Sequence, residues 1–217
     1  MTKKPERFVY LDIETTGLDV AHDRIIEISA LRNIESLHSR LNNAGVAIHE
    51  EASAVHGIKE ADLVDAPEFS AIAPKLVGMM TGAKVVAHNA PFVIAFLNAE
   101  LERAGIQPIN RRRVVDTLTM ARAKYPTGSN SLDALCSRYG VPMAAAGDGR
   151  EAFCKRLRFV HHHLRKSPLE SDVTAIHGLI SRNVETQREM WKRIVRIEEK
   201  LDTLLAAIQP KGSTASA

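Results

Sequence analysis

The most constraining feature of the sequence is the stretch FVYLDIETTGL, residues 8–18, in which two carboxylates interrupt an apolar run. The apolar and aromatic residues predict a β-strand. Side chains alternate between the faces of a strand, so Asp12 and Glu14 leave the same face. Two ionised carboxylates side by side repel each other, and burial penalises their charge unless a cation lies between them. Hard oxygen ligands at this spacing suit Mg²⁺ or Mn²⁺, and the alternative is a solvent-facing pair on an edge strand, which does not account for the apolar flanks.

Short apolar runs and helical spacings alternate along residues 7–140. Strands are expected at residues 7–12, 25–34, 37–48, 83–88 and 113–116. Helices are expected at residues 66–82, 89–105, 117–125 and 131–140. Pro91 in the first turn of the second helix and Gly105 past its end are typical of helix boundaries. Strands that first cluster and then alternate with helices predict an α/β or α+β fold with a mixed sheet of roughly five strands.

A change in composition near residue 146 predicts a boundary between two parts of the chain. We expect a domain at residues 1–146, a basic linker at 147–166, a C-terminal helix at 167–209 and a disordered tail at 210–217. His161, His162 and His163 lie in the linker. An exposed patch is favoured for them over a phosphate or soft-metal site.

The predicted C-terminal helix has a start signal and an apolar seam. Ser167, Pro168 and Glu170 form a typical helix start. Between Ile180 and Ile208, apolar residues recur at steps of four and three, which indicates a coiled coil. A helix of ~30 residues reaches about 45 Å, longer than a domain of this size conveniently covers. Self-association or a partner helix is therefore favoured over packing back on the domain.

Composition narrows the class of protein. With 29 Lys and Arg against 26 Asp and Glu, the chain permits a nucleic-acid partner without requiring one. Cys136 and Cys154 lack the spacing of a disulfide framework or a zinc site. No apolar run approaches the ~20 residues of a membrane span. We therefore expect a soluble, unprocessed protein in the cytoplasm, with no membrane partner.

Five segments in a fixed order carry a family resemblance: LDIETTGL, RIIEISAL, VHGI, HNAPF and NSLDALCSRYG. They resemble the DEDDh 3′–5′ exonucleases, the DnaQ-like family of the proofreading epsilon subunit of bacterial DNA polymerase III. The resemblance covers about residues 7–142. It implies a ribonuclease H-like α/β fold and phosphodiester hydrolysis with two Mg²⁺ or Mn²⁺ ions. By resemblance, Asp12 and Glu14 are catalytic residues and metal ligands, and the partner is the 3′ end of a single-stranded nucleic acid.

The resemblance also assigns residues to the terminal nucleotide. Thr15, Thr16 and Gly17 would bring backbone close to it, with glycine required because the turn after the strand needs a residue without Cβ. His56, in VHGI, and Phe92, in HNAPF, complete the predicted nucleotide-binding set. Apart from the family context, His56 would be interpreted as a histidine of a surface loop.

Two motifs of the family are degenerate here. The second motif is His-Asn-Ala-x-Phe-Asp in the family, and Val93 occupies its last position in this chain. Glu100, the next acid on the same helix, lies roughly 10 Å further along the axis, too far to bind the same metal. The third motif, a histidine followed five residues later by an aspartate, is missing after residue 142. The general base and two metal ligands therefore lack assignable residues, and only weak metal binding is expected.

Two further acids have structural interpretations. Asp116 lies where a strand ends and a helix begins, so a helix N-cap is favoured over metal binding. Asp133 is expected in the first turn of a helix, where the helix dipole favours a negative charge.

Two function classes follow. The favoured one is a protein that binds nucleic-acid 3′ ends, with catalysis weak or lost, and that assembles through its C-terminal helix. The alternative is an active two-metal exonuclease with non-standard ligands. A frameshift or gene fusion after residue 149 would also explain the missing third motif, and the coding DNA in other frames would show it.

Overall fold

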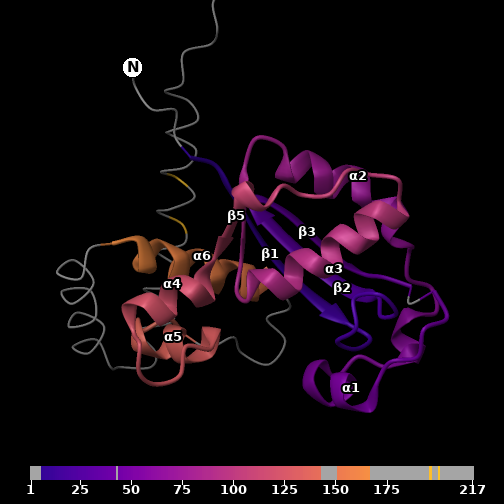
Figure 1. The fold of residues 1–217 in the computed structure, drawn as a ribbon, viewed down its shortest axis with the longest axis horizontal. Helices are drawn as coiled ribbons and strands as arrows, with labels where there is room; N and C mark the ends of the chain where they lie inside the picture. The colour runs from indigo at the N-terminus through magenta and orange to yellow at the C-terminus, as the bar shows by residue number, and fades with distance from the viewer. Residues whose placement is uncertain (1–5, 43, 143–150, 167–195, 197–199, 201–217) are drawn as a thin grey trace, which may run out of the picture.

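Five strands form one mixed sheet at the centre of the chain (Figure 1). The computed structural model describes residues 6–42, 44–142, 151–166, 196 and 200. The strands are β1 (Phe8–Thr15), β2 (Ile25–Arg32), β3 (Glu35–Arg40), β4 (Lys84–Ala87) and β5 (Val114–Asp116). Their order is β3-β2-β1-β4-β5; β1 pairs antiparallel with β2 and parallel with β4. The expectation of a mixed five-stranded sheet with β1 at its centre is confirmed.

Helices cover both faces of the sheet. The helices are α1 (Glu50–His56), α2 (Phe69–Met80), α3 (Ala90–Arg103), α4 (Thr117–Lys124), α5 (Leu132–Arg138) and α6 (Glu151–Arg165). Two short 3₁₀ helices, η1 (Glu60–Leu63) and η2 (Arg111–Arg113), lie in the connections. Side chains at odd positions of β1 pack with α2 and α3, and Tyr10 packs with α4, α5 and α6. Alternation along β1 therefore divides the core into two clusters.

Most of the predicted elements between residues 66 and 140 are present with small shifts of their ends. Pro91 lies in the first turn of α3, and Gly82, Gly105 and Gly140 follow α2, α3 and α5 with positive φ angles of 69°, 72° and 69°. Glycine reaches this left-handed region without the steric cost that a Cβ adds. The third strand is shorter and earlier than predicted, because β2 and β3 form a hairpin that turns at Asn33 with φ 55°.

Two helices were not predicted. Helix α1 ends with the first two residues of VHGI, Val55 and His56. Helix α6 occupies most of the segment interpreted as a linker, and that interpretation is wrong for residues 151–165. His161 and His163 are 2% and 3% exposed, so the prediction of an exposed histidine patch is wrong for these two; His162 is exposed. Cys154, Leu157, Val160 and Leu164 join them in the core cluster, because their spacing puts them on one helix face.

Several predictions concern other parts of the chain. The predicted boundary near residue 146, the helix at 167–209, its seam and the tail at 210–217 lie outside the described residues, apart from Arg196 and Lys200, which are helical and exposed. Cys136 and Cys154 are both buried, and neither is in a disulfide. Within the described residues, no helix is long and apolar enough to cross a bilayer.

Candidate functional site

Asp12 and Glu14 lie in the second half of β1, at the centre of the sheet. Both are half-buried, and by alternation they share the face of Tyr10. Tyr10 hydrogen-bonds His161 of α6 (Oη to Nδ1, 3.3 Å), which identifies that face as the one covered by α6. The two carboxylates therefore leave one face of the central strand, as alternation predicted.

The start of α3 lies beside this pair. In the parallel pairing of β1 and β4, Tyr10 lies opposite Val86, and the same register continued sets Asp12 level with His88. Helix α3 begins two residues later, and Val93 is in its first turn. Val93 is 4% exposed and belongs to the apolar cluster between the sheet and helices α2 and α3. The second-motif position thus contributes an apolar side chain to the core and no ligand.

The neighbouring acids are engaged elsewhere. Glu100 is 1% exposed and accepts hydrogen bonds from Arg24 Nε (2.6 Å), Arg24 Nη2 (2.9 Å) and Arg103 Nη1 (3.1 Å). Such a bidentate pair fixes the carboxylate, so Glu100 cannot replace the missing ligand. The hydrogen bond to Glu100 raises the pKa of Arg24, so the guanidinium stays charged despite its partial burial.

Asp116 joins two helices. Its Oδ1 accepts from the backbone N–H groups of Ala90 and Leu118, both at 3.1 Å, and its Oδ2 accepts from Thr119 Oγ1 at 2.6 Å. Asp116 is thus the N-cap of α4 and also satisfies the first amide of α3. The predicted N-cap role is confirmed. Asp133 lies in the first turn of α5, also as predicted, and pairs with Arg156 of α6 at 3.0 Å.

One buried acid on this face was missed by the sequence analysis. Glu27 of β2 lies opposite Glu14 and is 4% exposed. Its Oε1 lies 3.5 Å from Arg40 Nε and 3.9 Å from His38 Nε2, both on β3. Both contacts hold the Glu27 carboxylate on the side of β3. Its place in the strand pattern, opposite Glu14 in a hairpin, is the signal that could have revealed it.

The residues present do not complete a metal site. Among the residues that the structure describes, no group of three or more His, Cys, Asp and Glu side chains is close enough to hold an ion. Mg²⁺ and Mn²⁺ need several oxygen ligands in near-octahedral geometry, and two carboxylates from one strand supply only part of that set.

The predicted nucleotide-binding residues are divided between two adjacent segments. Thr15 ends β1, and Thr16 and Gly17 follow it. Thr15 Oγ1 donates to Gly17 O at 2.6 Å. His56 ends α1, and its Nδ1 accepts from Ile58 N at 3.0 Å. Nε2 therefore carries the proton and can donate to Thr15 O, 3.3 Å away. The structure thus brings His56 against the Thr15–Gly17 loop.

Phe92, the remaining predicted nucleotide-binding residue, packs against the core. It is half-buried, packs against the apolar cluster of α2 and α3, and its ring lies 4.8 Å from that of Phe96. His88, in the same HNAPF segment, hydrogen-bonds Thr117 Oγ1 at 3.0 Å, and burial lowers its pKa. His88 is therefore neutral at neutral pH and supports the junction of β4 and α4.

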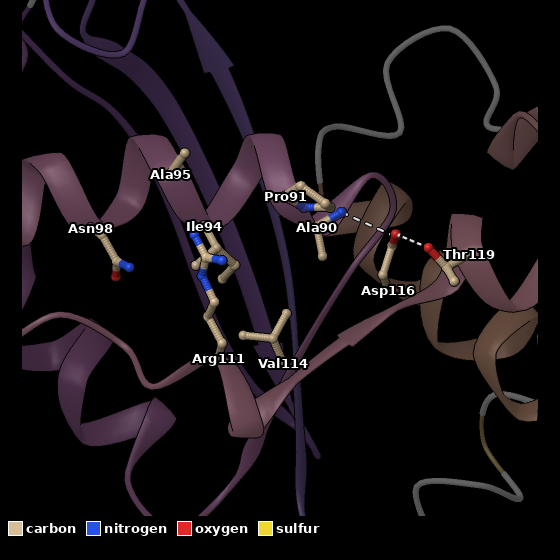
Figure 2. A pocket seen from close by; sticks show the side chains of 9 residues that line it. All are labelled: Ala90, Pro91, Ile94, Ala95, Asn98, Arg111, Val114, Asp116 and Thr119. Carbon is tan, nitrogen blue, oxygen red and sulfur yellow. Dashed lines mark hydrogen bonds between the residues drawn. The ribbon is translucent and has the colours of Figure 1, made fainter.

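A cavity of about 360 Å³ lies between α3, η2 and the start of α4 (Figure 2). Its floor is formed by Ile94 and Val114, with Arg111 on one side and the Asp116–Thr119 pair at one end. None of its lining residues belongs to β1 or α1. The cavity is therefore separate from the Asp12–Glu14 pair and from the Thr15–Gly17 loop.

Comparisons with known proteins agree on one group of relatives. The RNase_T family model, whose description is "Exonuclease", matches residues 9–149. The DNA polymerase III subunit epsilon of Pasteurella multocida is 33% identical over 224 residues, which cover 95% of this chain and 81% of that protein. The same subunit of Buchnera aphidicola subsp. Baizongia pistaciae is 36% identical over 154 residues, 64% of this chain and 62% of that protein. The match thus spans less than two thirds of the Buchnera protein.

Solved structures of low sequence identity share the fold. E. coli Exonuclease I in complex with a dT13 oligonucleotide is 18% identical with a TM-score of 0.63, covering 78% of this chain and 43% of that one. Exonuclease X in complex with 5′ overhanging duplex DNA is 21% identical with a TM-score of 0.51, covering 71% of this chain and 89% of that one. The fold prediction is confirmed.

Proposed function

The chain belongs to the RNase_T exonuclease family, and from that premise we propose that it binds the 3′ end of a single-stranded nucleic acid while hydrolysing it weakly or not at all. The observation that carries the proposal is a contrast between the residues for binding and the residues for catalysis. The Thr15–Gly17 loop and His56 lie together beside Asp12 and Glu14, whereas Val93 is buried in the core. The loop and His56 thus support binding, while among the residues that the structure describes the set of metal ligands is incomplete.

Exposed apolar side chains beside the loop support the proposal that the protein binds a 3′ end. Leu18, directly after the loop, is 81% exposed, and Val55, directly before His56, is 84% exposed. Large apolar side chains at such exposure often mark a binding surface, and an unstacked terminal base offers a flat apolar face to them. The fold is shared with Exonuclease X in complex with duplex DNA and with Exonuclease I in complex with a dT13 oligonucleotide, which supports the same use of this surface.

The proposed low activity follows from the number of acidic side chains that could bind a metal ion. Asp12 and Glu14 have the spacing of a ligand pair, and Glu100 and Asp116 are committed to structural hydrogen bonds. With the second-motif acid replaced by Val93, a metal ion would be poorly held. Weak or absent hydrolysis follows, because loss of a general base alone costs about 10²–10⁴ in rate.

A single assay tests both halves. A 5′-labelled single strand is incubated with the full chain, with Mg²⁺ or Mn²⁺, and compared with the same strand closed into a circle. We expect binding of the linear strand in preference to the circle and little shortening from the 3′ end. Equal binding of both would refute the binding half. Robust shortening that disappears in Asp12→Ala would instead establish an active enzyme with non-standard ligands.

Val93→Asp tests the explanation for low activity. Burying a carboxylate at this site should destabilise the protein by about 1–3 kcal/mol without metal. Mg²⁺ should recover part of that loss in thermal unfolding, because an ion that binds only the folded state stabilises it. Ile94→Asp, one residue along the helix and also buried, is the matched control. Equal Mg²⁺ effects on both variants would show that Val93 does not occupy a latent ligand position.

A further inference from the structure

Asp23, a residue that no sequence motif singles out, organises the connection between β1 and β2. It is 1% exposed. Its Oδ1 accepts from Thr16 Oγ1 at 2.7 Å, and its Oδ2 accepts from the backbone N–H of Asp19 at 2.8 Å. Thr16 Oγ1 also accepts from Arg24 N at 3.0 Å. A charged acceptor of this kind makes stronger hydrogen bonds than a neutral one, so Asp23 fixes both the Thr16 side chain and the backbone that follows it.

Gly17 packs directly on this carboxylate. A Cβ placed on Gly17 would lie 2.5 Å from Asp23 Oδ2 and 2.7 Å from His49 Nδ1. Gly17 is not among the residues with positive φ, so its requirement for glycine is one of space. The sequence analysis expected a residue without Cβ at this position, and the close approach of Asp23 and His49 is the reason. The loop, Asp23 and His49 are instead packed in contact.

Helix α1 has no hydrophobic anchor. None of its residues from Glu50 to His56 is buried. Its two ends are held to the loop by polar contacts: His49, at the N-cap position, donates its backbone N–H to Thr16 O at 2.8 Å, and His56 Nε2 lies 3.3 Å from Thr15 O. The side chain of His49 also lies 3.5 Å from Asp23 (Nε2 to Oδ1). A short helix without apolar burial depends on such contacts for its position.

From these contacts we propose that Asp23 and His49 are positioning residues that hold the Thr15–Gly17 loop and helix α1 together as one unit for a 3′-terminal nucleotide. Neither residue contacts the nucleic acid; each acts through the loop and the helix. The choice of a 3′-terminal nucleotide as the ligand rests on the proposed function. The attachment of helix α1 to the loop rests on the hydrogen bonds alone.

The test uses the full chain with Asp23→Asn and His49→Gln. Asparagine keeps the size of Asp23 but replaces one acceptor oxygen by a donor NH₂, which opposes either Thr16 Oγ1 or the N–H of Asp19. We expect faster amide exchange at residues 15–19 and 49–57 together. Loss of one such hydrogen bond should weaken binding of a 5′-fluorescein linear single strand, measured without divalent metal, about tenfold. Binding of the circular strand should not change.

Matched controls lie in the same connection. Asp19→Asn and His22→Gln make the same chemical changes in an exposed pair, whose side chains are 60% and 84% exposed. Both controls should bind the linear strand within about twofold of the wild type, because exposed pairs contribute little. The double variant Asp23→Asn/His49→Gln should be no weaker than Asp23→Asn alone, because both substitutions remove the same contact.

The outcomes separate the two proposals. If the wild type binds linear and circular strands equally, the proposed function is refuted. Amide exchange in the variants still tests whether Asp23 and His49 hold the loop and helix α1 together. Equal exchange and affinity for Asp23→Asn and Asp19→Asn refute the positioning role. A general destabilisation would weaken linear and circular binding alike, which also refutes it. His49→Gln keeps the test open if Asp23→Asn does not fold, because the side chain of His49 is 57% exposed.

Discussion

Helices α1 and α6 flank the same strand, β1, and are held to it by opposite means. Helix α6 buries Cys154, Leu157, Val160 and Leu164 against β1 and β2 and against α4 and α5. Helix α1 buries none of its residues and is held by polar contacts at its two ends. Apolar burial fixes a helix strongly, whereas a few partly exposed hydrogen bonds allow local opening. The helix that borders the proposed binding surface is thus the weakly held one.

The largest effect should come from truncating the apolar contact of α6. Leu157 is fully buried, so Leu157→Ala should lower the free energy of unfolding by about 2–5 kcal/mol. Val55→Ala in α1, where Val55 is 84% exposed, should change it by less than about 0.5 kcal/mol. Urea unfolding of both variants gives the comparison. Similar losses would mean that α1 is anchored through Val55 and that apolar burial holds both helices.

Acid should loosen α6 next. Burial lowers the pKa values of His161 and His163 to about 4, below the 6.5 of an ordinary histidine. Between these values the unfolded chain binds protons that the folded chain does not, so stability is complete above pH 6.5 and falls as the pH drops toward 4. At pH 5 the loss should be about 2 kcal/mol for each histidine.

His161→Phe isolates this effect. Phenylalanine fills the site between Phe8 and Tyr10 without a titrating group, since the rings of Phe8 and Tyr10 lie 4.8 and 5.8 Å from that of His161. Thermal unfolding from pH 7.5 to 5 should therefore depend less on pH in His161→Phe than in the wild type. An unchanged pH dependence would show that His161 is protonated in the folded protein.

The same contrast explains what could be predicted from the sequence. Helix α3 and the sheet follow from apolar periodicity and from Pro91 and Gly105, which are local signals. Helix α6 has an apolar face as well, but it is completed by Cys154, His161 and His163, residues that the pattern counted as polar or basic. Helix α1 has no apolar face, so periodicity had nothing to detect.

The residues of the candidate site also differ in whether local sequence signals could predict them. Asp12 and Glu14 share a face because strands alternate, and Glu100 was excluded as a ligand by helix rise; both arguments are local. Asp23 could not be found in this way, and Glu27 could be found only from its pairing opposite Glu14. Their burial depends on partners that only the folded chain brings together, His49 for Asp23 and Arg40 for Glu27.

A small change in overall stability should come from breaking the contact that closes α1 on the loop. His56→Ala removes the hydrogen bond between Nε2 and Thr15 O, which at 3.3 Å is long and partly exposed. The free energy of unfolding should fall by less than about 1 kcal/mol. Exchange of the α1 amides should nevertheless quicken severalfold, because the helix retains only its contacts at His49 and Ser53. Exchange in α6 should not change. If His56→Ala instead lowers the stability of the whole domain as much as Leu157→Ala does, α1 unfolds only with the core, and the proposed difference between the two helices is wrong.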